Sequence, residues 1–215
     1  MGLRRGYEVL SKCKVQGTDK MAALEEYVRL EDPNMLIAAL GIILKPGIWT
    51  VMCRSEYRTR WMTNLFRSKY TACSVMAVTI LLMGMVRDSL YMTALQGQPS
   101  LSAIQLPVVG YAIAGIGSLF VLSSFWRLGW YCTFMGDYFG IHLDERIGSF
   151  PFSVLDNPMY WGTTLNFVGV AFMMGSPAGL LLCGLIVLCY KILLTYEEPF
   201  TADIYSKRGL EQKKV

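Results

Sequence analysis

The chain has 215 residues, of which 53% are apolar and only 17% are charged. An ordinary soluble domain is about 45–50% apolar and about 25% charged, so this composition argues against a soluble protein and favours one integral membrane unit. The net charge of +4 does not indicate a nucleic-acid partner. The basic residues cluster beside apolar runs, where they can meet anionic lipid headgroups.

The cysteine and histidine content predicts neither a disulfide framework nor a metal site. The six cysteines form no C-x-x-C pair, and we expect all of them to be reduced or buried in lipid: Cys13, Cys53, Cys73, Cys132, Cys183 and Cys189. The single histidine, His142, rules out a multi-histidine metal site, and we expect it to lie in a loop.

Residues 1–32 form an N-terminal extension without the apolar segment of a signal peptide. Within it, Met21 to Val28 has helical spacing, which predicts a short interfacial helix. The first apolar run, Pro33 to Cys53, is interrupted by Lys45-Pro46-Gly47. Only 12 uncharged residues precede Lys45, whereas a full span needs about 20. This pattern predicts a re-entrant or in-plane helical hairpin.

Two further runs follow in the middle of the chain. Tyr70 to Val86 has 17 residues and can just span a membrane. A turn is expected at 96–100, and the third span at about Val108 to Trp126. Along this span small residues recur every four positions and let another helix approach closely: Gly110, Ala114 and Ser118.

The last run, Asn157 to Tyr190, has 34 residues without a charge. Gly175-Ser176-Pro177 divides it, so it is either one long kinked helix or a helical hairpin. The chain is therefore predicted to be an all-α integral membrane protein with three to five membrane-embedded helices, a membrane domain at 33–206 and a basic tail at 207–215. The positive-inside rule favours a cytosolic Arg54–Lys69 loop, and a hairpin puts the Arg127–Asp156 loop and the tail on one face.

Two polar clusters flank this last run. The first is Asp156-Asn157-Pro158-Met159-Tyr160-Trp161-Gly162, and its first three residues are typical of a helix start, with a cap and a proline in the first turn. The second is Tyr196-Glu197-Glu198-Pro199-Phe200, where Pro199 is expected to end the helix. Paired acids are unfavourable both at a helix C-terminus and beside a membrane, which favours a functional role for them.

Gly115-Ile116-Gly117 lies within the third span. It is not a dinucleotide-binding fingerprint, because no strand precedes it and the position of a third glycine is Phe120. Two explanations stay open and are compatible: close helix packing, or access of a ligand to the backbone.

Several motifs together carry a resemblance to the phosphatidylethanolamine N-methyltransferase family over roughly residues 33–206. They are Phe150-Pro151-Phe152, Leu155 to Gly162, Gly136 to Gly140, Ser123 to Phe125, and Tyr196 to Thr201 followed by Tyr205. The resemblance implies S-adenosyl-L-methionine as methyl donor and phosphatidylethanolamine as acceptor, methylated three times through mono- and dimethylated derivatives to phosphatidylcholine. It assigns donor binding to Gly115, Ile116, Gly117, Glu197 and Glu198.

The resemblance also implies a multi-pass protein of the endoplasmic reticulum membrane, or of mitochondrial membranes. Other membrane methyltransferases commonly carry a histidine where this chain has Asn157, so a histidine-based chemistry does not carry over. The reaction itself needs a group that takes a proton from the lipid amine, and Asp156, Tyr160 and Glu198 are the candidates. Asn157, Pro158, Asp137 and Tyr138 are candidates for the shell around the headgroup or donor.

Two other classes of function stay open on the sequence. The first is a related methyltransferase or reductase that acts on a prenyl-cysteine or a sterol. The second is a non-enzymatic carrier or scaffold. A carrier is expected to place ionisable groups within its spans, and Lys45 is the only charge inside an apolar run as we delimit the runs.

Overall fold

The computed structural model describes residues 26–143 and 147–212. Within these ranges the chain is helical and has no strand. The elements in chain order are α2 (Pro33–Thr59), α3 (Trp61–Phe66), α4 (Lys69–Gly97), α5 (Pro107–Thr133), the short 3₁₀ helix η1 (Gly136–Phe139), α6 (Pro158–Met174) and α7 (Pro177–Gln212). The predicted interfacial helix lies mostly outside the described residues, and its last residue, Val28, is described but not helical.

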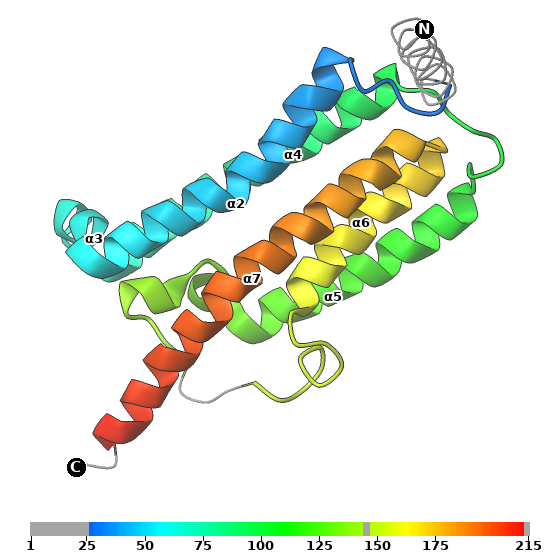
Figure 1. Ribbon diagram of the computed structural model, residues 1–215. Helices are drawn as coiled ribbons and strands as arrows, with labels where there is room; N and C mark the ends of the chain where they lie inside the picture. Colours follow the sequence, from blue (N-terminus) through cyan, green and yellow to red (C-terminus); the bar gives the residue numbers. More distant parts are fainter. Residues whose placement is uncertain (1–25, 144–146, 213–215) are drawn as a thin grey trace, which may run out of the picture.

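The long helices run up and down in one bundle (Figure 1). Helices α2 and α4 form a pair on one side, α5 and α6 lie together on the other side, and α7 packs against α6, α2 and α4. One end of the bundle carries the starts of α2 and α5 and the turn between α6 and α7. The opposite end carries α3, η1, the loop before α6 and the C-terminus, and α7 extends beyond the other helices there.

The first apolar run is one continuous helix, so the predicted hairpin is wrong. Helix α2 passes through Pro46 and is 27 residues long, about 40 Å. A proline inside a helix removes one hydrogen bond, here the one to the Ile42 carbonyl, and α2 continues in spite of that loss. In the turn that follows, the Thr50 hydroxyl adds a hydrogen bond to the Pro46 carbonyl at 2.7 Å. Lys45 does not end the run, because its ammonium group lies 5.2 Å from the centre of the Trp49 ring.

The second run also extends further than its uncharged part. Helix α4 continues to Gly97, so Arg87 and Asp88 lie within it rather than beyond its end. Arg87 is buried and pairs with Asp88 at 2.7 Å, and its Nη1 donates to the Tyr190 hydroxyl at 3.0 Å. Lys45 is therefore not the only charge within the membrane-length helices.

Of the two alternatives for the last run, the structure has the hairpin. Helix α6 ends at Met174, and Gly175 follows in the left-handed conformation with φ 61°. This conformation costs glycine nothing and is the usual way to close a helix. The Ser176 hydroxyl then accepts from the Gly179 N–H at 3.1 Å and caps α7.

The closest helix contact is between α5 and α6, as the small-residue stripe predicted. A Cβ placed on Gly110 would lie 2.6 Å from the Gly169 carbonyl oxygen, and one on Gly117 would lie 2.6 Å from the Gly162 carbonyl oxygen. Such distances leave no room for a side chain, so the two backbones touch directly. The Ser118 hydroxyl adds a hydrogen bond to the Asn166 side-chain oxygen at 3.2 Å.

In the part of the chain that the structure describes, four helices are long and apolar enough to cross a membrane, namely those beginning at Pro33, Lys69, Pro107 and Pro177. Helix α6, with 17 residues, lies at the lower limit for a span. Large apolar side chains on the outside of the bundle are freely exposed, among them Val108 at 82% and Trp126 at 86%. In water such a surface would be unfavourable, so it is the surface that faces lipid.

We expect Gly117→Ala to destabilise the solubilised protein by about 1–3 kcal/mol, because its methyl group would force α5 and α6 apart. Gly115→Ala is the matched control, since a Cβ at Gly115 meets nothing within 4 Å. Thermal unfolding of both variants in detergent measures the difference. Equal midpoints would contradict the packing role of Gly117.

Candidate active site

The two polar clusters meet at the end of the bundle where α6 begins. The Tyr160 hydroxyl donates to Glu197 Oε2 at 2.7 Å, and Asn157 Nδ2 donates to Glu198 Oε1 at 2.9 Å. These partners are 37 and 41 positions apart in the sequence and meet because α6 and α7 form a hairpin. Each of the two acids therefore accepts a hydrogen bond from a different residue at the start of α6.

The start of α6 is built differently from an ordinary helix cap. Asn157 occupies the cap position and Pro158 the first turn, as the sequence indicated, but the Asn157 side chain makes no capping hydrogen bond. It donates to Glu198 instead. Asp156 is exposed and has no hydrogen bond to another described residue. Helix capping therefore does not account for the presence of either Asp156 or Asn157 at this position.

Pro199 does not end the helix, so that prediction is wrong. Helix α7 continues through Pro199 to Gln212. Proline lacks the N–H that would bond the carbonyl of Thr195, and the carbonyl of the next residue, Tyr196, accepts from Arg54 Nη2 at 2.9 Å. Contacts of this kind let a helix continue past a proline.

Arg54 brings a positive charge from α2 to the segment of α7 that carries the acids, through its contacts with Tyr196 and Phe200. Its guanidinium carbon lies 5.8 Å from the ring centres of both Tyr196 and Phe200. Arg54 Nε is buried and has no hydrogen-bond partner in the described part of the chain. A buried donor without a partner is unusual in a folded protein and indicates room for a further acceptor.

Phe200, one of the rings beside Arg54, belongs to a cluster of three aromatic rings. Phe200 stacks on Tyr138 with ring centres 4.5 Å apart, and Tyr57 meets Phe200 edge to face at 4.8 Å. Rings in such an arrangement offer negative faces to a cation, including a methylated ammonium. Arg54 and Tyr57 carried no signal of their own in the sequence, because an arginine in a basic segment and aromatics near a membrane are common. Phe200 was indicated only as a member of the cluster Tyr196 to Phe200.

The loop after α5 is tied to the same place by Asp137. Asp137 Oδ1 accepts from the Tyr205 hydroxyl at 3.2 Å and lies 3.0 Å from Nδ1 of His142. Arg60 and Lys69 hold the backbone of this loop, through the carbonyls of Tyr138 at 3.4 Å and Gly140 at 3.0 Å. Asp137 and Tyr138 thus contact Tyr205 and Phe200 of α7, the helix that carries the acid pair.

The Gly115–Gly117 segment lies on the far side of α6, and its two glycines differ. Gly117 is buried against Gly162 and Asn166, which is the packing explanation. Gly115 is exposed and has open space around it, so a ligand can approach its backbone. The hydrogen bonds described for Glu197 and Glu198 come from Tyr160 and Asn157 rather than from this segment.

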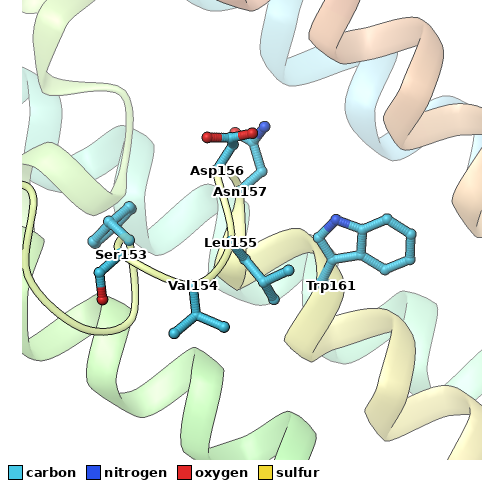
Figure 2. A pocket seen from close by; sticks show the side chains of 7 residues that line it. Ser153, Val154, Leu155, Asp156, Asn157 and Trp161 are labelled. Carbon is cyan, nitrogen blue, oxygen red and sulfur yellow. The ribbon is translucent and has the colours of Figure 1, made fainter.

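A hollow of about 260 Å³ lies beside the first cluster. It is lined by the loop before α6 and by Trp161, and Figure 2 shows Asp156 and Asn157 at the end of this loop with Trp161 on the first turn of the helix. Because Asn157 both lines the hollow and holds Glu198, the hollow adjoins the acid pair.

The cysteines and acidic side chains form no metal-binding group in the ranges that the structure describes. The cysteines there are free thiols, at Cys53, Cys73, Cys132, Cys183 and Cys189, and Cys13 lies outside these ranges.

Comparison with known proteins gives the family of this chain. A family profile described as "Phospholipid methyltransferase" matches residues 106–208. The chain is 44% identical to the phosphatidyl-N-methylethanolamine N-methyltransferase of Emericella nidulans over 194 residues, 90% of this chain and 96% of the relative. It is also 44% identical to the human phosphatidylethanolamine N-methyltransferase over 192 residues, 88% and 96% of the two chains. A Saccharomyces cerevisiae relative, a phosphatidyl-N-methylethanolamine N-methyltransferase, is 40% identical over 191 residues, 87% and 93% of the two chains.

A bundle of membrane-length helices with a polar site at one end, matched to these relatives over most of its length, defines a membrane-embedded enzyme that acts on lipids. The chain belongs to the phospholipid methyltransferase family, which confirms the resemblance seen in its motifs. No solved structure matches it.

Replacing Tyr205 by Phe removes the hydroxyl that joins Asp137 and the Leu143 N–H. We expect amide hydrogen exchange in residues 136–143 to become about fivefold faster, since a hydrogen bond contributes about 1 kcal/mol. Mass spectrometry of the exchanged protein measures this. Tyr111→Phe on the exposed face of α5 is the control, and unchanged exchange in Tyr205→Phe would contradict the tie.

Proposed function

We propose that this protein is an S-adenosylmethionine-dependent N-methyltransferase that converts phosphatidylethanolamine to phosphatidylcholine by three successive methylations, through the mono- and dimethylated lipids. The observation that carries the proposal is the joining of the two family clusters through the Tyr160–Glu197 and Asn157–Glu198 hydrogen bonds. These bonds assemble an anionic, hydrogen-bonding site at the end of an apolar bundle. A water-soluble donor and a lipid acceptor can meet at such a boundary.

The residues around the acids suit the donor. S-adenosylmethionine carries an ammonium group, a carboxylate and ribose hydroxyls, and it supplies an electrophilic methyl group on a sulfonium centre. Glu197 and Glu198 are acceptors for its ammonium and hydroxyl groups, and Arg54, with its unpartnered buried Nε, is a donor for its carboxylate. The open backbone at Gly115 is a second place where a ligand can approach closely.

The lipid amine must lose a proton before its nitrogen can attack the methyl carbon. At neutral pH an alkylamine is protonated, since its pKa resembles that of lysine, about 10.4. The Tyr160 hydroxyl already donates its hydrogen to Glu197, so a proton that reaches the phenol oxygen can be passed to this carboxylate. The new carbon–nitrogen bond forms as the carbon–sulfur bond breaks, and positioning of the two reactants supplies much of the acceleration.

Among the three candidates for the proton acceptor, the structure favours the Tyr160–Glu197 pair. Asp156 is exposed and unconnected, so nothing orients it towards a substrate. Glu198 is also exposed, and its carboxylate already receives the Asn157 amide. Tyr160 is half-buried and fixed by both Glu197 and the ring of Tyr190, whose centre lies 4.7 Å away.

The end of the bundle that carries the site also carries the basic segment from Arg54 to Lys69. By the positive-inside rule this end faces the cytosol, where the donor is made available. The protein is accordingly proposed to lie in the endoplasmic reticulum or a mitochondrial membrane with its donor site on the cytosolic face. The loop before α6 and the C-terminal part of α7 lie at this same end (Figure 1).

The acceptor is tested with membranes that contain this chain and methyl-labelled S-adenosylmethionine. Phosphatidylethanolamine and its monomethyl derivative are supplied in separate reactions, and the lipids are then separated. We expect label in the mono-, di- and trimethylated lipids when phosphatidylethanolamine is supplied. Label only from the monomethyl lipid would limit the reaction to the later steps, and no label from a folded, inserted protein would refute the proposal.

Glu197→Gln and Glu198→Gln each remove a charge that faces the donor. We expect the dissociation constant of the donor to rise about 10–100-fold in each variant, since a hydrogen bond to a charged group contributes about 1.5–3 kcal/mol. Calorimetric titration with S-adenosylhomocysteine and with S-adenosylmethionine measures this. Glu31→Gln is the control, because Glu31 is exposed before α2 at the opposite end of the bundle. Donor affinity equal to that of the control would refute the assignment.

A further inference from the structure

A second polar site lies inside the bundle, away from the acid pair. It is a small hollow between α2, α4 and α7, lined among others by Lys45, Trp49, Arg87 and Tyr190. Lys45 lies near the midpoint of α2, and Arg87 lies well inside α4. Ionisable side chains at such depth are costly and mark functional sites in membrane proteins.

The hollow has an excess of donors and positive charge. Arg87 is paired with Asp88, but no carboxylate lies within ion-pairing distance of Lys45 in the described part of the chain. The Lys45 ammonium lies against α4, where a Cβ on Gly84 would be 3.3 Å from its Nζ. Its favourable neighbours are the Trp49 ring, at 5.2 Å, and Asp88, which attracts the ammonium charge from beyond ion-pairing distance. The three charges therefore sum to one net positive charge.

Trp49 supplies an independent sign of a missing acceptor. The side chain is only 5% exposed, and its Nε1 is buried without a hydrogen-bond partner among the described residues. A buried hydrogen-bond donor without an acceptor destabilises the folded protein by about 1–3 kcal/mol, so such donors are rare in native structures and often mark a binding site. Lys45 and Trp49 are one helical turn apart on α2 and line the same hollow. A cation without an ion pair and an N–H without an acceptor would both be stabilised by an anion bound there.

The hollow is connected to the catalytic end by a row of side chains. Arg87 donates to the Tyr190 hydroxyl at 3.0 Å, the Tyr190 ring packs on the Tyr160 ring at 4.7 Å, and Tyr160 donates to Glu197. Tyr190 and Glu197 are seven residues apart on α7, which is about 10 Å along the helix axis. The flexible side chain of Lys45 can extend towards the acid pair and so shorten the distance between the bound phosphate and Tyr160.

We infer that this hollow binds the phosphodiester group of the acceptor phospholipid while the lipid amine reaches Tyr160, an inference that rests on the proposed function. The acceptor is a zwitterion whose amine and phosphate are joined by two carbons. The protein presents the complementary order of charges, with carboxylates at the end of the bundle and cations deeper within it. The hollow's free volume of about 10 Å³ has room for about one water-sized oxygen, so it takes one anionic oxygen of the phosphodiester.

Lys45→Met removes the charge but keeps the length and apolar stem of the side chain. We expect the concentration of lipid acceptor for half-maximal rate to rise about tenfold or more, with unchanged affinity for S-adenosylhomocysteine, and Lys45→Arg to restore most of the loss. Trp49→Phe keeps the ring, removes Nε1 and is expected to give a smaller loss in the same direction. Lys191→Met is the matched control, because Lys191 follows Tyr190 on α7 but is exposed.

Binding is also measured without catalysis, by native mass spectrometry of the purified protein with phosphatidylcholine and with diacylglycerol of the same chains. We expect Lys45→Met to lose phosphatidylcholine and to keep whatever diacylglycerol the unaltered protein binds. This assay stands even if no methylation is found, so failure of the inference and failure of the proposed function are distinguishable. Loss of donor affinity would assign Lys45 to the donor's carboxylate, and equal lipid binding in Lys45→Met and Lys191→Met would assign it a structural role; either result overturns the inference.

Discussion

The arrangement of this protein depends on how two adjacent carboxylates are accommodated at the edge of an apolar helix. Glu197 and Glu198 follow directly on a segment that faces lipid, where an unpaired carboxylate is costly. Each receives a hydrogen bond from the start of α6. These bonds fix the register of α6 against α7 and bring the helix start, which is a separate motif in the sequence, onto the acids.

Helix α6 can hold this register because its opposite face is fixed to α5. Glycines on both helices allow the backbones to touch, which leaves α6 little freedom to slide or rotate. One face of α6 thus packs against α5, while Asn157 and Tyr160 donate hydrogen bonds to the two acids of α7. The site is therefore built on rigid elements, and the residues added by α2 and η1, such as Arg54 and Tyr138, complete it from the other side.

Much of this could be predicted from the sequence, and what could not has a physical cause. The packing stripe through Gly110 follows from the rule that small residues let helices approach closely. Gly175-Ser176-Pro177 is compatible with a hairpin and with one long kinked helix, so the sequence alone does not predict that the two clusters meet. For the first run and the end of α7 the predictions are wrong: Pro46 and Pro199 predict breaks in the sequence, and neither ends its helix. The donor beside Pro199 comes from Arg54 of α2, so the spacing of residues along α7 does not show it.

The charges inside the spans could not be predicted from the sequence either. An isolated arginine is unfavourable in a membrane, so the sequence predicts that the second run ends before Arg87. Its partner Tyr190 lies 103 positions away, and only the packing of α4 against α7 shows that its guanidinium is satisfied. The same packing leaves Lys45 without an ion pair among the described residues, a contrast that has no counterpart in the sequence.

An anchor on the phosphate would also explain how one site can serve three successive reactions. The acceptor nitrogen changes at each step, since it gains a methyl group and loses one N–H, so contacts to the amine alone weaken as the reaction proceeds. The phosphodiester is the same in all four lipids, and a cation that holds it keeps the nitrogen within reach of Tyr160 at every step. The trimethylated nitrogen has neither a proton to give up nor an electron pair with which to attack. The series therefore ends after the third methylation, and no residue is needed to recognise the number of methyl groups.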